Sequence, residues 1–246
     1  MEILLRLIIM ILALPIVLVM FLFLLICGLF VDPKKQYERD SRFFRALLDG
    51  STTFILWSLG VRYNIIGEEN FPESGNFLFI SNHRSNYDPI IQWTVFKRFK
   101  ISFISKKANF KIPMYGRIIH RCCFMPIDRE NPRKAMETVN RAARLLSLGE
   151  NCVGVYPEGK RSKSCKLLPF HSGVLKSAQK SGKPIVVATI EGTESVFKNI
   201  KRLRKSVVTI KIHETIDAER VKATKTALLS DYCAELMKKE LEEQAS

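Results

Sequence analysis

The chain begins with a long run of apolar residues. Between Leu7 and Val31 no residue is charged, and at about 1.5 Å per residue such a helix exceeds the ~30 Å hydrocarbon core of a bilayer. The run is longer than the apolar part of a secretory signal, which favours its retention in the mature protein. Pro15 interrupts the helical pattern, so a kinked or re-entrant hairpin competes with a straight span.

Basic residues are distributed unevenly on the two sides of this run. Only Arg6 precedes it, whereas five follow it: Lys34, Lys35, Arg39, Arg42 and Arg45. An excess of positive charge marks the cytoplasmic side of a membrane segment. We therefore expect a protein of the cytoplasmic membrane (the inner membrane in cells that have two membranes), with the domain that follows the apolar run facing the cytoplasm.

A second, shorter apolar pattern follows between residues 43 and 59. Phe43, Leu47 and Phe54 recur at near-helical spacing, and Trp57 lies near the end. The pattern fits an amphipathic helix at the membrane interface, and equally a helix packed on the domain. Residues 1–60 are accordingly predicted to form the membrane-anchoring helices.

From residue 61 onward, short β-rich runs alternate with helical patterns. The predicted strands are residues 63–66, 76–81, 101–105, 123–127, 152–156, 185–189 and 207–212, and the predicted helices are residues 88–97, 131–148, 171–182 and 218–243. Such alternation predicts an α/β domain over residues 61–246, with a mixed, partly parallel β-sheet flanked by helices.

Composition narrows the possibilities further. The 246 residues are 47% hydrophobic and 26% charged, with a net charge of +15, which excludes a disordered or collagen-like chain and a polytopic membrane bundle. None of the six cysteines forms a CxxC pair, and no histidine stands at a zinc-like spacing from them, so they are expected to be reduced and no metal site is predicted.

Three predicted strand ends carry the candidate chemistry, because functional groups collect there in α/β folds. At the first, His83 follows a buried strand and Asp88 stands where a helix begins. An imidazole steered by a carboxylate is a natural general base, although Asp88 could simply cap the helix. At the second, a tight loop through Glu158 and Gly159 carries Arg161. This loop could bind a phosphate group or could be an ordinary solvated loop. At the third, a strand delivers Arg129, which could instead pair with a neighbouring acid.

These motifs, in this order, resemble the glycerolipid acyltransferase family. They are Asn82-His83-x4-Asp88 (an HX4D motif), Phe124-x-x-Ile127-Asp128-Arg129, Tyr156-Pro157-Glu158-Gly159-x-Arg161-Ser162 and Lys183-Pro184-Ile185-Val186. The similarity is greatest to the bacterial-type 1-acylglycerol-3-phosphate O-acyltransferases and covers residues 63–192. Lys160, His171 and Val187 depart from the usual pattern.

The resemblance implies acyl transfer from acyl-CoA or acyl carrier protein to the 2-hydroxyl of lysophosphatidic acid, giving phosphatidic acid for phospholipid biosynthesis. His83 would be the base and Asp88 its orienting group. Arg129 and Arg161 would hold the phosphate, Glu158 and Gly159 would shape that pocket, and Lys106 would contribute charge. No metal and no cofactor beyond the acyl donor are implied, and membrane lipids are the expected surroundings.

Three alternatives remain at this point. The acceptor could be another lysolipid, such as a lysophospholipid or lyso-ornithine lipid. A covalent acyl-cysteine could form on Cys165 or on the Cys122-Cys123 pair. The protein could also be a non-catalytic basic module that binds membranes, whereas nucleic acid is not expected because the aromatic residues do not interleave with the basic ones.

Overall fold

The structure is a computed structural model and describes residues 1–243, so the last three residues of the predicted domain lie outside the described part. Its centre is a seven-stranded sheet in the order β1-β7-β6-β2-β5-β3-β4. The strands are β1 (Val61–Ile66), β2 (Leu78–Ser81), β3 (Ser102–Lys106), β4 (Met125–Ile127), β5 (Val153–Val155), β6 (Ile185–Glu191) and β7 (Ser206–Ile216). Among the described strands, only the β6–β7 pair is antiparallel; the other pairs are parallel. The predicted mixed α/β class is confirmed.

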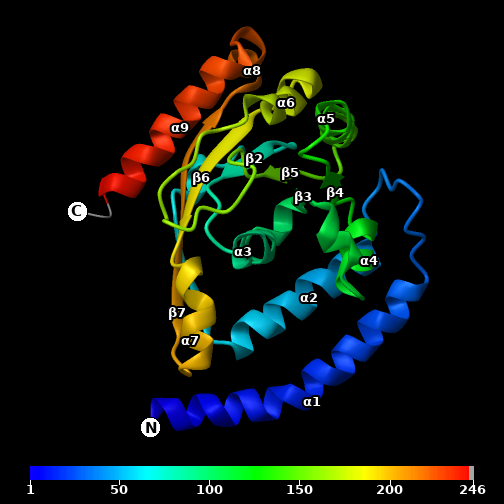
Figure 1. Cartoon of the computed structure of the whole chain (residues 1–246), viewed down its shortest axis with the longest axis vertical. Coiled ribbons are helices and arrows are strands. Elements are labelled where there is room, and N and C mark those ends of the chain that lie inside the picture. Colours follow the sequence, from blue (N-terminus) through cyan, green and yellow to red (C-terminus); the bar gives the residue numbers. More distant parts are fainter. Residues whose placement is uncertain (244–246) are drawn as a thin grey trace.

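Helices cover both faces of the sheet. One face packs against α2 (Arg42–Ser58), α3 (Tyr87–Val95) and α4 (Tyr115–Arg121), with Phe79 of β2 pointing into that layer. The other packs against α5 (Pro132–Leu148), α6 (Lys176–Ser181), α8 (Ala218–Ala223) and α9 (Thr226–Glu243), with Leu78 and Ile80 pointing there (Figure 1). Because side chains alternate along a strand, the continuous apolar run of β2 fills two cores at once.

The apolar amino-terminal run forms one helix, α1 (Glu2–Leu29), long and apolar enough to cross a membrane by length and composition. Figure 1 shows α1 along one edge of the molecule, with α2 between it and the sheet. Both ends of α1 are attached to the body. Near its start, Arg6 donates to the carbonyl of Leu59 at 2.8 Å, and just beyond its end, Arg117 donates to the carbonyl of Val31 at 2.6 Å.

The attachment at the start of α1 depends on a glycine. Gly60 has a φ of 68°, and a Cβ atom there would lie 1.4 Å from the Arg6 guanidinium. A side chain at position 60 would therefore exclude Arg6 from its place as well as strain the backbone. The turn between α2 and β1 is thus shaped to receive the first part of α1.

Some predicted elements differ from the observed ones. The predicted helix 218–243 is divided into α8 and α9, because Thr224 is extended and its carbonyl accepts a hydrogen bond from Gln179 at 3.1 Å instead of continuing the helix. The predicted helix 171–182 starts as a 3₁₀ turn, Ser172–Leu175, before α6. Two short helices, α4 and α7 (Val196–Lys201), were not predicted. All seven predicted strands are present, with ends shifted by a few residues.

Candidate active site

His83 and Asp88 are in direct contact at the carboxyl end of β2. His83 Nδ1 lies 2.7 Å from Asp88 Oδ2, and the Asp88 side chain is fully buried whereas that of His83 is 15% exposed. The same Oδ2 accepts the backbone N–H groups of Arg84 at 2.6 Å and Ser85 at 2.8 Å. Asp88 therefore holds the whole turn around His83. It is not the helix cap, since that position belongs to Asn86.

The orientation of the imidazole follows from this pairing. A buried carboxylate accepts a hydrogen bond, so Nδ1 carries the hydrogen and Nε2 keeps its lone pair. His83 lines a cleft of about 750 Å³. The ring is further fixed by stacking, because Tyr156 lies parallel to it with centroids 4.2 Å apart, and Phe103 stacks on Tyr156 at 5.4 Å. The Tyr156 hydroxyl donates to Gln92 Oε1 at 2.7 Å, which prevents the stack from sliding.

Glu158 lies behind the cleft and not in its wall. Its side chain accepts the backbone N–H of His83 at 2.6 Å through Oε1 and that of Leu168 at 2.9 Å through Oε2. Burial raises the pKa of its carboxyl group to about 7, although both hydrogen bonds oppose the rise. Glu158 was expected to shape the phosphate pocket, and the structure shows it buried, where it ties the His83 turn to the loop that carries Arg161.

That loop is joined to the His83 turn a second time. The backbone N–H of Ser162 donates to the carbonyl of His83 at 2.8 Å, so Arg161 is delivered to the same cleft as the imidazole. Gly159 has a φ of 69°, and a Cβ there would lie 2.9 Å from the His171 ring. The glycine therefore lets the loop turn tightly against its neighbour.

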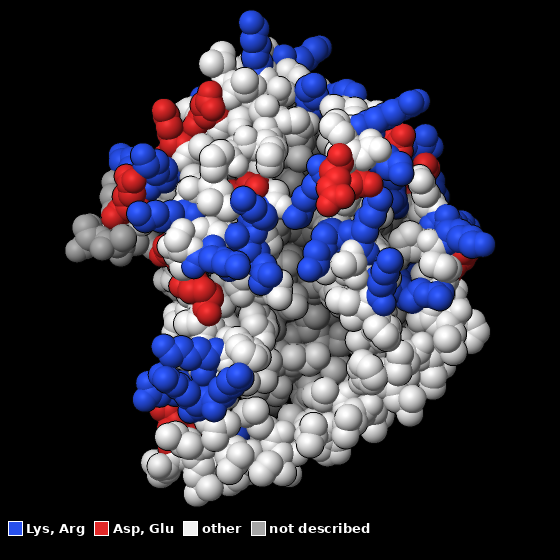
Figure 2. Space-filling view, in the orientation of Figure 1, with Lys and Arg blue, Asp and Glu red and all other residues white. Residues whose placement is uncertain are grey.

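Cationic side chains dominate the polar wall of the cleft. The lining includes the three cations predicted to bind substrate, which are Lys106, Arg129 and Arg161. It also includes two lysines of the loop that carries Arg161, Lys160 and Lys163. Asp128 pairs with Lys107 at 2.6 Å, so the acid next to Arg129 has another partner. Burial lowers the pKa of Arg129 from its ordinary value. Figure 2 shows Lys and Arg side chains gathered around a central hollow of the molecule.

A second cavity, of about 320 Å³, opens beside the cleft. It shares Ile104, Arg129 and Tyr156 with the cleft, and the rest of its lining is mainly apolar, including Met136 and Val139 of α5. Together the two spaces offer a cationic chamber and an apolar chamber, with Tyr156 of the His83 stack in the wall of both. This arrangement suits a substrate with a charged head and a hydrocarbon chain.

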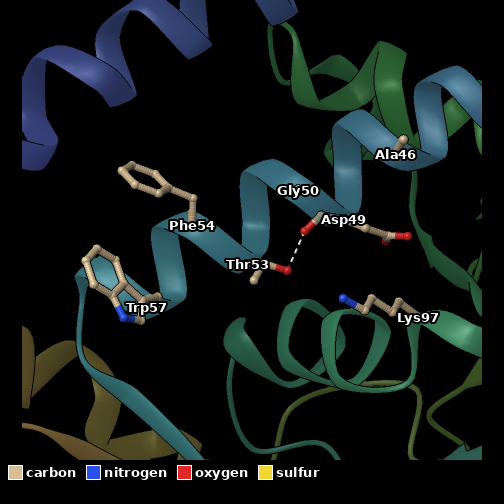
Figure 3. Close-up of a pocket in the computed structure, with 7 residues that line it drawn as sticks. All are labelled: Ala46, Asp49, Gly50, Thr53, Phe54, Trp57 and Lys97. Carbon is tan, nitrogen blue, oxygen red and sulfur yellow. Dashed lines mark hydrogen bonds between the residues drawn. The ribbon is translucent and has the colours of Figure 1, made fainter.

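Another hollow lies on α2, away from this chemistry. It is lined by Asp49, Lys97, Phe54 and Trp57 among others, and Figure 3 shows the two aromatic rings at one end of it and Lys97 across from Asp49. Burial raises the pKa of Asp49 to about 6. The hollow and the catalytic cleft share no lining residue.

The candidate cysteines are poorly placed for covalent chemistry. Cys122 and Cys123 are completely buried, and burial raises the pKa of Cys123 to about 12. Cys165 is partly exposed, and its backbone carbonyl accepts a hydrogen bond from Arg84. A thiol with such a high pKa is a weak nucleophile at neutral pH, which disfavours an acyl-cysteine on the adjacent pair.

Two residues of the site make contacts with segments distant in sequence that the motifs did not predict. Thr193, which follows β6, donates its hydroxyl to Asp88 Oδ1 at 2.5 Å. Asn82 brackets Ile190 of the same strand, donating to its carbonyl at 3.0 Å and accepting its N–H at 2.8 Å. The available signal was the polar turn Glu191-Gly192-Thr193 at the end of a buried strand, which becomes meaningful only once β6 is known to adjoin β2.

With this geometry established, similarity to known proteins decides the family. The sequence profile of the Acyltransferase family matches residues 62–191, more than half of the chain. The chain belongs to the acyltransferase family. The match spans His83, Asp88 and every cation that lines the cleft, so the predicted resemblance is confirmed and the protein is an acyltransferase.

Several relatives within this family have names that state their activity. A 1-acyl-sn-glycerol-3-phosphate acyltransferase of Salmonella typhimurium is 27% identical over 169 residues, covering 69% of this chain and 68% of that protein. The Haemophilus influenzae enzyme of the same name is 29% identical, covering 76% and 77%. A chloroplast enzyme of that name from Arabidopsis thaliana is 34% identical, covering 69% and 45%.

The fold is also shared with a solved acyltransferase. The crystal structure of the 1-acyl-sn-glycerophosphate acyltransferase from Thermotoga maritima superposes with a TM-score of 0.71, covering 100% of this chain and 98% of that one. At 24% identity, this likeness shows that the overall fold is shared.

Proposed function

We propose that this acyltransferase transfers a fatty acyl chain from acyl-CoA or acyl carrier protein to the 2-hydroxyl of lysophosphatidic acid, producing phosphatidic acid. The observation that carries the proposal is the His83–Asp88 pair, whose imidazole opens onto a cleft with cationic walls beside an apolar cavity. Relatives of this chain are named 1-acyl-sn-glycerol-3-phosphate acyltransferases, which supports this acceptor.

The reaction begins with proton removal by His83. Nε2 accepts the proton of the lipid hydroxyl as that oxygen attacks the thioester carbonyl carbon, while Asp88 stabilises the resulting imidazolium. A new C–O bond forms and gives a tetrahedral intermediate. Its collapse breaks the C–S bond, and the departing thiolate takes the proton from the imidazolium. In this scheme the thiol is a good leaving group, so neither a metal nor a cofactor takes part.

The cationic cleft and the apolar cavity would bind different parts of the substrate. Arg129 and Arg161 are suited to bind the acceptor phosphate, because a guanidinium can donate two parallel hydrogen bonds to it. Lys106 adds positive charge on the same wall. The apolar cavity lined by Met136 and Val139 would take the acyl chain of a substrate, away from water.

The membrane setting follows from the two attachments of α1. A helix that crossed the bilayer along its normal would carry its two ends to opposite sides, yet Arg6 and Val31 both bond to the same folded body. We therefore place α1 lengthwise in one leaflet, on the cytoplasmic side, with the cleft at the level of the lipid headgroups. This location brings the enzyme to its membrane-lipid acceptor.

An acceptor panel tests the proposal. The purified protein is given acyl-CoA or acyl carrier protein with lysophosphatidic acid, lysophosphatidylethanolamine or lyso-ornithine lipid, and products are identified by mass. We expect phosphatidic acid as the main product with either donor. A main product formed from lyso-ornithine lipid or a lysophospholipid would replace the acceptor assignment, and release of free thiol without any acylated lipid would overturn the proposal.

A further inference from the structure

A dense cluster of positive charge follows β6, outside the catalytic cleft. We define the α7 patch as the exposed cations of α7 and the turn after it: Lys198, Lys201, Arg202, Arg204 and Lys205. No acidic residue interrupts this stretch between residues 195 and 206. Apolar side chains lie among the charges, since Phe197 is 58% exposed and Val207 is 62% exposed.

The α7 patch lies beside the first turns of α1. Lys205 forms an ion pair with Glu2 at 2.7 Å, and Figure 1 shows α7 approaching the N-terminal end of α1. In Figure 2, Lys and Arg side chains form a separate group in this lower part of the molecule, apart from those around the central hollow. The residues of the α7 patch lie outside the lining of the cleft.

We infer that the α7 patch binds the headgroups of anionic phospholipids in the bilayer that holds α1. This inference rests on the membrane placement given under the proposed function. It follows from continuity, because the patch adjoins a helix whose apolar residues are mostly exposed, and from charge, because anionic lipids attract exposed Lys and Arg side chains within a Debye length.

The composition of the α7 patch favours a lipid surface over an acidic protein or nucleic acid. Long Lys and Arg side chains can keep their charge among headgroups while Phe197 and Val207 enter the boundary with the acyl chains. Lys201 already lies over the Phe197 ring, with Nζ 4.5 Å from its centroid. The patch and the exposed apolar side of α1 would then meet one bilayer, and headgroup contacts would restrict rotation of the body about the α1 axis.

The experiment measures the approach of the α7 patch to headgroups in the full chain. Phe197→Cys is introduced with Cys165→Ser, because the other cysteines are buried, and the new thiol is labelled with bimane. The labelled protein is reconstituted into phosphatidylcholine vesicles with or without phosphatidylglycerol, and a headgroup nitroxide lipid is the quencher. We expect stronger quenching with phosphatidylglycerol, and loss of that difference at about 1 M salt, where the Debye length is ~3 Å.

Two four-residue variants provide the matched comparison. In the patch variant Lys198, Lys201, Arg202 and Arg204 become Gln, while Lys205 keeps its pair with Glu2. In the control variant four exposed lysines of α5, α6 and the α8 region become Gln: Lys134, Lys176, Lys222 and Lys225. Since each cation near an anionic surface contributes roughly fivefold to binding, the loss of four should weaken docking by about 600-fold, and the patch variant should quench as in phosphatidylcholine alone.

Two results would overturn the inference. One is equal quenching in vesicles with and without phosphatidylglycerol, and the other is the same loss of quenching in the control variant as in the patch variant. The quenching needs no substrate, and turnover by the same preparations in detergent micelles reports separately on the acyltransferase reaction. A failed acceptor panel therefore leaves the lipid-binding result interpretable.

Discussion

The hydroxyl of Thr193 is hydrogen-bonded to Asp88 Oδ1 at 2.5 Å, on the side of the carboxylate opposite His83. Both carboxylate oxygens are thus occupied, and Thr193 is completely buried. The contact connects the turn after β6 to the turn after β2. It fixes the rotation of the carboxylate, and through it the direction in which Nε2 of His83 points.

Replacing Thr193 should therefore slow the reaction without weakening substrate binding. A hydrogen bond to a charged group contributes about 1.5–3 kcal/mol, so Thr193→Val, which keeps the shape, is expected to lower kcat by about 10- to 100-fold with KM little changed. Thr193→Ser, which keeps the hydroxyl, should recover most of the rate. Equal kcat values for Val and Ser variants of similar Tm would show that Thr193 only packs.

Removal of the base should have the largest effect on turnover. We expect His83→Ala to lower kcat by about a thousandfold, because general-base catalysis contributes 10²–10⁴, while the fold is retained. His120→Ala is the matched control, since that ring bonds the carbonyl of Lys35 at 2.8 Å outside the cleft. Steady-state rates of thiol release measure both. Activity of His83→Ala within tenfold of the unaltered enzyme would contradict its assignment as base.

The cationic wall should distinguish acceptors by charge. Arg161→Ala is expected to raise KM for lysophosphatidic acid by about tenfold, the loss of one charge-assisted hydrogen bond, and to leave the KM for an acceptor without phosphate nearly unchanged. Lys166→Ala removes an exposed cation from the same loop that does not line the cleft, and should change neither value. A similar KM increase for both acceptors would place Arg161 outside phosphate recognition.

The buried carboxyl group of Glu158 should make the free energy of unfolding depend on pH. Burial raises its pKa from 4.5 to about 7 in the folded state, so between these values the folded protein binds more protons than the unfolded one, and stability falls as pH rises through this window. Above it the loss is complete. The Tm difference between the unaltered enzyme and Glu158→Gln should therefore shift against the unaltered enzyme from pH 4.5 to 7 and then level off. A difference independent of pH would refute this titration.

Much of the fold could be predicted from local pattern. The strands β2, β5 and β6 are almost completely buried apolar runs. The helix α5 is signalled by Asn131, which caps it, Pro132 in its first turn and Gly149 after its end. The spacing of His83 and Asp88 also constrains them to one turn of chain. Local pattern sufficed because each feature depends on residues that are neighbours in sequence.

The remaining features depend on how distant segments meet. Thr193 reaches Asp88 only because β6 lies beside β2. The periodicity of a single strand does not predict the order of strands in a largely parallel sheet. Likewise Arg6 fits against Gly60 only once α1 folds back along α2. Glu158 is held behind the cleft because its carboxylate accepts hydrogen bonds from two backbone N–H groups in separate segments. The motif alone does not reveal these contacts.

The fastening of α1 at both ends has a practical consequence for anyone preparing this enzyme. Leu24 belongs to the same apolar core as Leu48 and Leu56 of α2, and Arg6 satisfies the last carbonyl of the α2 region. Removing α1 by truncation, to obtain a protein that needs no detergent, would open that core to water and leave apolar side chains of α2 exposed. The helix is therefore an integral part of the folded enzyme, although most of its apolar residues are exposed, and the intact chain is the form to crystallise or assay.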